Sequence, residues 1–151
     1  MGDRKPIGVA YRDQDIDGGE IGRNDPQLVR GTRLYATEEL GYCSCAFSEV
    51  TQLTSKSTAV TINTPTGRIT MDDAQLNNNA VARFTMNNTS INSNDVVIVN
   101  IKLNGSTPEA YIAFVADIGE GFADLALWNR SGGPLSEAVE LNFAVIRNRV
   151  D

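Results

Sequence analysis

Apolar and polar residues alternate along several short segments in the last hundred residues of the chain. In the segment 80–86, Ala82, Phe84 and Met86 are predicted to face one side of a strand, and the residues between them the other. Similar patterns predict further strands over 58–63, 67–71, 95–102, 109–117, 122–129 and 139–147. Because helical periodicity is scarce, the pattern predicts an all-β fold, an antiparallel β-sandwich that is jelly-roll-like.

Two pairs of neighbouring strands are expected to form hairpins. The segments 58–63 and 67–71 are separated by a short Thr-Pro-Thr-Gly turn, and the segments 109–117 and 122–129 by a turn that contains two glycines. In the last segment, 139–147, the alternating residues Val139, Leu141, Phe143 and Val145 are predicted to face the core.

The segment 95–102 has a different pattern, because Val96, Val97, Ile98 and Val99 are consecutive. Successive side chains of a strand point to opposite faces, so an unbroken apolar run places apolar side chains on both faces. Such a strand is expected to be covered on both sides. The pattern therefore predicts either a central strand or a strand with one face against a partner.

Residues 1–49 form a predicted extended N-terminal arm, and residues 50–151 a β-sandwich domain. The arm is rich in glycine and acidic residues and has little hydrophobic periodicity. A segment with so few apolar residues does not build its own core, so the arm is expected to contact a partner chain. The predicted contact residues are Ile7, Val9, Tyr11, Leu28, Leu34 and Tyr35 for apolar contacts and Asp13, Asp15, Asp17, Arg23 and Arg30 for polar ones.

One motif in the arm is typical of metal binding. Asp13, Asp15 and Asp17 alternate and are followed by Gly18, as in the first half of a calcium-binding loop. The position where such a loop has a bidentate glutamate is Asn24, and neither flank has a helical pattern. Two interpretations stay open: a Ca²⁺ site on the three aspartates, or a solvated acidic loop that faces basic groups of a partner. No other cofactor is expected.

Composition and charge exclude several classes of function. The chain of 151 residues has a net charge of −6, and its length fits one domain. Nucleic-acid binding needs clustered lysine and arginine, so it is not expected. No apolar run approaches the ~20 residues that span a bilayer, and none near the N-terminus is typical of a signal peptide. We therefore expect no membrane contact, and synthesis in a cytoplasm.

The side chains that usually carry catalysis are few. The chain contains no histidine, which removes the commonest general base and metal ligand. Three carboxylates lie near one turn: Asp117, Glu120 and Asp124. Two interpretations are open: they include the pair of acids that a glycosidase uses, or they are ordinary acidic residues of a turn. Trp128 and Tyr111 are candidates for stacking on a sugar or for the core.

The two cysteines, Cys43 and Cys45, are predicted to be reduced, partly buried thiols. They are too few for a closed zinc site. No redox or other enzymatic activity is expected.

Six segments of the chain are similar in sequence to a known family: 50–52, 54–63, 67–71, 84–88, 95–101 and 135–146. They resemble a β-rich structural domain of tailed-bacteriophage virion proteins. The resemblance spans 51–147, about two thirds of the chain, and leaves the N-terminal arm unmatched. It implies a structural module on a phage particle, on either the capsid or the tail.

From this resemblance we expect a capsid cement or decoration protein that binds the outside of the shell as a trimer and stabilises it. Its expected partners are the major capsid protein and other virion proteins, and its expected location is the capsid surface of the virion. Repeated interfaces between many copies would supply the stabilisation. The alternative is a tail or fibre component that binds a host glycan.

Overall fold

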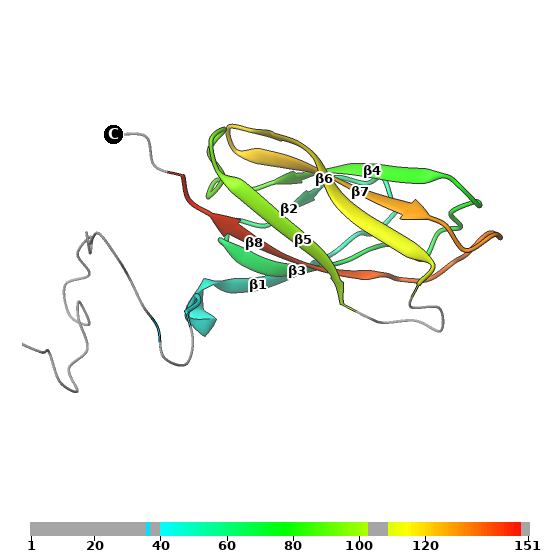
Figure 1. Ribbon diagram of the computed structural model, residues 1–151, viewed down its shortest axis with the longest axis horizontal. Coiled ribbons are helices and arrows are strands. Elements are labelled where there is room, and N and C mark those ends of the chain that lie inside the picture. The colour runs from blue at the N-terminus through cyan, green and yellow to red at the C-terminus, as the bar shows by residue number, and fades with distance from the viewer. Residues whose placement is uncertain (1–35, 37–39, 103–108, 149–151) are drawn as a thin grey trace, which may run out of the picture. The chain divides into compact units, whose positions relative to one another are not determined.

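The computed structural model describes residue 36, residues 40–102 and residues 109–148. These residues form one 3-10 turn and eight β-strands, and no α-helix is present among them (Figure 1). The elements are η1 (Ser44–Ala46), β1 (Phe47–Thr51), β2 (Val60–Thr61), β3 (Thr66–Thr70), β4 (Val81–Asn87), β5 (Val96–Lys102), β6 (Tyr111–Gly119), β7 (Phe122–Asn129) and β8 (Glu140–Ile146).

The strands form two four-stranded sheets that enclose a core. Sheet A has the order β1-β3-β8-β5 and sheet B the order β2-β4-β7-β6. The predicted all-β, sandwich-like fold is confirmed, but not its uniform antiparallel pairing, because β1 pairs with β3 and β2 with β4 in parallel. The chain crosses to the other sheet after each of these first strands, so the next strand in the same sheet runs in the same direction.

The hairpin predicted for 58–63 and 67–71 is wrong. β2 lies in sheet B and β3 in sheet A, and only four residues separate them. Ile62 and Ile69 are both buried between the two sheets. Burying apolar side chains from both segments in one core stabilises this crossing between the sheets. The local sequence, two strand patterns on either side of a turn, is equally compatible with a hairpin and with such a crossing.

Alternation predicted the inward-facing residues of the other strands correctly. Ala82, Phe84 and Met86 of β4 are buried, with exposed or half-buried residues between them. On β8 and just before it, the residues predicted to face the core are all buried: Val139, Leu141, Phe143 and Val145. One face of each strand is therefore covered by the opposite sheet, as the period-2 pattern requires.

The second predicted hairpin is confirmed. β6 and β7 pair in antiparallel fashion from Tyr111 opposite Asn129 to Gly119 opposite Phe122, with a register shift between Val115 and Asp117. Gly121 in the turn has a φ of +77°, which favours glycine. Its backbone N–H donates to the carbonyl oxygen of Ile91 at 2.9 Å, which joins this turn to the loop before β5.

Strand β1 and its neighbour β3 approach each other closely. β1 begins at Phe47 and so includes residues that composition assigned to the N-terminal arm. A Cβ atom on Gly67 of β3 would lie 2.6 Å from the backbone oxygen of Ser48 and 2.8 Å from side-chain atoms of Ile62 and Phe143. Only glycine fits there without a shift of the neighbouring atoms.

Lys56, in the loop that joins β1 to β2, is buried and ties loops together. Its Nζ donates to the backbone oxygen of Asp72 and, at 2.6 Å, to that of Glu137. Burial lowers the pKa of Lys56, while the acidic side chains of Asp72, Asp73 and Glu137 act in the opposite direction. The buried ammonium group of Lys56 therefore links three loops through its hydrogen bonds.

Strand β5 is the last strand of sheet A, so the central position offered for 95–102 is wrong. The two sheets are not joined by strand pairing within the described residues, so the sandwich has two sides at which an edge strand of one sheet lies next to an edge strand of the other. We call these the open sides: β5–β6 and β1–β2. Val97 of β5 is buried, whereas Val96 and Ile98 are 53% and 49% exposed. The other interpretation, a partner on the outer face, stays a prediction.

Candidate interaction surface

The outer face of sheet A divides into a polar half and an apolar half. The strand register places Glu49, Arg68, Asn142 and Asn100 in one row across β1, β3, β8 and β5. Two strand positions away, the corresponding row is Phe47, Thr66, Ala144 and Ile98. Residues two apart on a strand share a face, so all of these side chains point away from the core.

Ion pairs connect the polar half. Arg68 Nη1 lies 2.9 Å from Glu49 Oε1, and Arg68 Nε lies 3.6 Å from Glu140 Oε2. Lys102 Nζ lies 3.0 Å from the same Glu140 oxygen. The acids and bases of this half are therefore paired with one another across all four strands, and its charges need no external partner.

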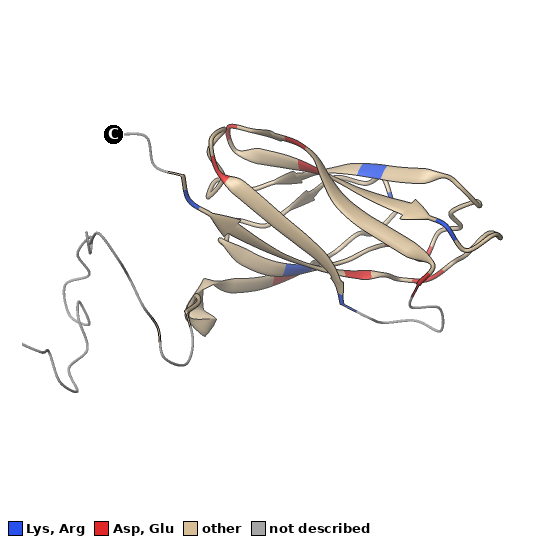
Figure 2. Ribbon diagram, in the orientation of Figure 1, with Lys and Arg blue, Asp and Glu red and all other residues tan. Residues whose placement is uncertain are grey.

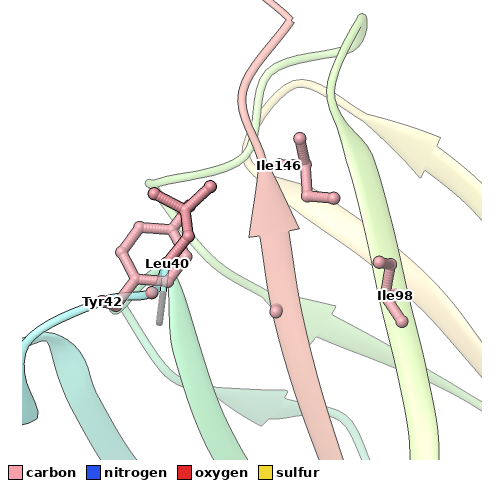
Figure 3. A pocket seen from close by; sticks show the side chains of 6 residues that line it. Leu40, Tyr42, Ile98 and Ile146 are labelled. Carbon is pink, nitrogen blue, oxygen red and sulfur yellow. The ribbon is translucent and has the colours of Figure 1, made fainter. Parts of the chain in front are cut away.

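The apolar half carries the surface that we call patch A, which comprises Leu40, Tyr42, Val96, Ile98, Ala144 and Ile146. A hollow of about 460 Å³ opens here, lined by Leu40, Gly41, Tyr42, Ile98, Ala144 and Ile146. Figure 3 shows Ile98 and Ile146 on one side of it and Leu40 and Tyr42 on the other. Ala144 is small and lies on β8 between larger neighbours, which leaves the space open.

Tyr42 is fixed on this surface by a hydrogen bond. Its hydroxyl donates to the backbone oxygen of Val145 on β8. The backbone N–H of Val145 donates at 2.8 Å to the oxygen of Pro65, just before β3 begins. Tyr42 thus occupies an acceptor at the end of the β3–β8 ladder, and its ring, together with Leu40 at 78% exposure, forms one wall of the hollow.

The outer face of sheet B carries a second apolar surface, patch B, which comprises Val81, Ile112, Phe114 and Trp128. The register places Val81, Trp128 and Ile112 in one row across β4, β7 and β6. Val81, Ile112 and Phe114 are 50%, 43% and 39% exposed. The Arg130 guanidinium lies over the Trp128 ring, 4.6 Å from its centroid, so one face of the indole is covered.

The carboxylates considered for hydrolysis are engaged in local contacts. Asp124 Oδ2 lies 2.8 Å from Arg83 Nη2, and Asp124 Oδ1 accepts a hydrogen bond from the Thr85 hydroxyl at 2.7 Å. The Thr85 hydrogen bond, with help from Arg83, lowers the pKa of Asp124. Asp117 accepts from the backbone N–H of Ile118, and Glu120 from that of Ser93. A carboxyl group with a lowered pKa is a poor proton donor at neutral pH.

Tyr111 does not have the exposure that sugar stacking requires. It is 8% exposed, on the inner face of β6. Burial, together with the neighbouring Glu137 carboxylate, raises the pKa of Tyr111 to about 12. The stacking interpretation is therefore wrong for Tyr111, and Trp128 is the only one of the two aromatic candidates on an outer face.

The two cysteines form a disulfide, so the prediction of reduced, partly buried thiols is wrong. Cys43 and Cys45 are both exposed, just before and within the turn that leads into β1. Their Cα atoms are 5.3 Å apart, within the range that a disulfide bridges. The prediction of reduced thiols rested on the expected synthesis in a cytoplasm and not on the local backbone, which is a 3-10 turn.

The arm residues predicted from sequence lie outside the described residues, and so do the three aspartates of the calcium motif. They are Ile7, Val9, Tyr11, Asp13, Asp15, Asp17, Arg23, Leu28, Arg30, Leu34 and Tyr35. Among the residues that the structure describes, no group of three or more Asp, Glu or Cys side chains is arranged to hold a metal ion.

Sequence reasoning singled out Val96 to Val99 and Trp128 but missed the other residues of the two patches. The run of apolar residues from Ile112 to Ala116 on β6 is the same kind of signal, because it also places apolar side chains on both faces. Both runs form edge strands on the same open side. Leu40, Tyr42, Ala144 and Ile146 gave no such signal, since only the folded chain brings them together.

Comparisons with known proteins provide no relative for this chain. Neither a scan against protein-family models, nor a search of curated proteins, nor a search of solved structures found a match. In the described part of the chain, no helix has the length and apolar character needed to cross a membrane.

Proposed function

We propose that this protein is a structural protein of a bacteriophage virion, a decoration protein that binds the outside of the capsid as a trimer and stabilises the shell. The observation that carries the proposal is patch A. Large apolar side chains are about half exposed or more there, around an open hollow. The chain already has an apolar core between its two sheets, so these side chains are not part of that core. Apolar patches with a polar surround are typical of surfaces that bind another protein.

The two halves of the outer face of sheet A favour assembly over chemistry. The polar half pairs its own charges, so it stays compatible with solvent, while the apolar half is free to be covered. An interface core depleted of charge with a polar rim is the usual anatomy of protein contacts. The proposal assigns the protein no catalytic role.

In this proposal, the N-terminal arm binds the capsid shell. Its apolar residues, such as Ile7, Val9 and Tyr11, would contact the major capsid protein, and Asp13, Asp15 and Asp17 would face basic groups or a Ca²⁺ ion. The sandwich would be jelly-roll-like, an architecture that recurs in viral capsid proteins.

The test is a count of copies on particles. Particles would be banded in a density gradient after prophage induction of the organism that encodes the chain, and the protein would be quantified by mass spectrometry. An icosahedral lattice predicts on the order of hundreds of copies per particle for a decoration protein. Absence of the chain from purified particles would overturn the proposal.

A tail or fibre component that binds a host glycan is the second candidate. It is favoured by Trp128, a partly exposed aromatic side chain on the outer face of sheet B next to Ile112. A few to dozens of copies per particle would favour it. Binding of the full chain to a glycan array, lost in Trp128→Ala and kept in Phe47→Ala, would support this role; no binding would exclude it.

A further inference from the structure

The two apolar patches lie along the same open side of the sandwich. Patch A includes Val96 and Ile98 of β5, and patch B includes Ile112 and Phe114 of β6, the strand that β5 contacts across the core. Figure 2 shows the middle of both strands without charged residues. An edge strand usually carries charges, a bulge or a short length as protection against pairing. β6 has a register shift between Val115 and Asp117, but the exposed patch residues of both neighbouring edges are apolar.

The size of the patches fits a contact between proteins. Half-exposed side chains of this kind leave roughly 300–500 Å² of apolar area on each patch, which is the size of the largest apolar patch on a typical monomer and is often functional. A standard interface buries about 800 Å² on each partner, with a polar rim around the apolar centre. Each patch with its surrounding polar residues therefore supplies the core of one interface of ordinary size.

We infer that copies of this chain associate head to tail, with patch A of one copy against patch B of the next. The patches differ in form: patch A surrounds a hollow, whereas patch B presents the large side chains of Ile112 and Phe114 on an edge strand. A contact between two unlike patches leaves one of each uncovered in a dimer, so association continues to a closed ring or to an open filament.

The number of copies in the ring, three, is taken from the proposed function, on which this step rests. Because the patches flank one open side, closure of the ring requires each copy to turn its β5–β6 side toward the centre. This inference deepens the trimer of the proposed function by naming its surfaces, which lie among the described residues. A mass measured without particles tests it independently of the virion assignment.

The test uses two single variants of the full chain, Ile98→Glu on patch A and Phe114→Glu on patch B. Light scattering after size-exclusion chromatography should give three chains for the unmodified protein and one chain for each variant. In a mixture, the intact patch A of F114E binds the intact patch B of I98E, so a two-chain species should form.

Phe47→Glu is the matched control. Phe47 is 42% exposed and Phe114 is 39% exposed, but Phe47 lies on β1 at the opposite edge of sheet A. F47E should therefore keep the three-chain mass. Circular dichroism of every variant shows whether the fold is retained.

A second variant avoids the introduced charge. Ala144→Leu fills the hollow with an apolar side chain, and should raise the concentration at which half of the chains are associated by about tenfold or more. A single-chain mass for the unmodified protein would overturn the inference. Loss of association in I98E alone, with F114E unchanged, would also overturn it, because it would show a symmetric contact through patch A. Equal loss in F47E would overturn it as well.

Discussion

The two open sides of the sandwich are built differently. On the β1–β2 side, β2 has only two residues, and β1 carries Glu49, which pairs with Arg68. On the β5–β6 side, the strands have seven and nine residues, and their outward side chains near Ile98 and Phe114 are apolar. Short or charged edges resist association with other strands, whereas long apolar edges favour it.

The contrast separates residues that hold the fold from residues available for binding. The β1–β2 side contains tight internal contacts, such as those at Gly67 and Lys56, and these should respond to substitution through stability. The outward residues of the β5–β6 side contribute less to the core, so their substitution should alter association more than folding. Inner-face residues of β6, such as Tyr111, still belong to the core.

The largest loss of stability is expected for Gly67→Ala, on the β1–β2 side. The added Cβ meets the backbone oxygen of Ser48 at 2.6 Å, and separating β1 from β3 should lower the free energy of unfolding by about 3 kcal/mol. Urea unfolding followed by circular dichroism measures this. Gly133→Ala is the control, because a Cβ there meets no atom within 4 Å. Similar stabilities of the two variants would contradict the packing described for β1.

Lys56→Met should cost about 2 kcal/mol at neutral pH, because the backbone oxygens of Asp72 and Glu137 lose their donor. The pKa of Lys56 is lowered in the folded state, so the folded protein releases this proton first as pH rises. The contribution of Lys56 should therefore make stability rise between its folded pKa and 10.5.

Comparing the unmodified protein with K56M across that window isolates the contribution, since other groups titrate in both. An identical pH dependence of the two proteins would show that Lys56 is not a buried cation.

Tyr111, on the inner face of β6, should give the opposite slope. Its pKa is raised from 10.0 to about 12, so the folded state holds the proton more tightly than the unfolded state does. Stability from this group is fully present below pH 10 and is lost as pH rises toward 12, by about 2 kcal/mol.

Unfolding of Tyr111→Phe in the same pH series measures this contribution. The variant should lack the alkaline loss while keeping the Lys56 contribution. An unchanged alkaline loss in Y111F would place its origin elsewhere.

The smallest effect is expected for Asp124→Asn on the outer face of sheet B. The pKa of Asp124 is lowered by Thr85 and Arg83, so its contribution is present above pH 3.8 and is lost as pH falls through its folded pKa. Because the pair with Arg83 is near the surface, the loss at neutral pH should stay below about 1 kcal/mol. Acid unfolding of D124N should be shallower than that of the unmodified chain, and a larger loss at neutral pH would show a stronger pair.

Local alternation predicted the strands whose outer face is polar. β4 has an apolar face and a mostly polar face, and the outer face of β8 begins with Glu140 and Asn142, so the period-2 pattern by itself identifies Phe84 and Phe143 as core residues. The β6–β7 hairpin was predictable as well, because its strands are adjacent in sequence and the turn contains Gly121.

What local patterns did not predict are the relations between distant segments. The parallel pairing of β1 with β3 depends on a crossing between sheets, and a strand pattern carries no information about which sheet a strand joins. The same applies to β5: an apolar run such as Val96 to Val99 is compatible with a central strand and with an edge that meets a partner. The hollow at Ala144 also arises from segments far apart in the chain.

The fluorescence of Trp128 reports directly on whether unlike patches on the β5–β6 side join copies of the chain. Trp128 is the only tryptophan of the protein and lies in patch B. Its emission should shift to the blue as the unmodified chain is concentrated, and should not shift in Ile98→Glu, although that substitution lies on the other sheet. Emission that is independent of concentration, or that shifts equally in I98E, would contradict a contact between unlike patches.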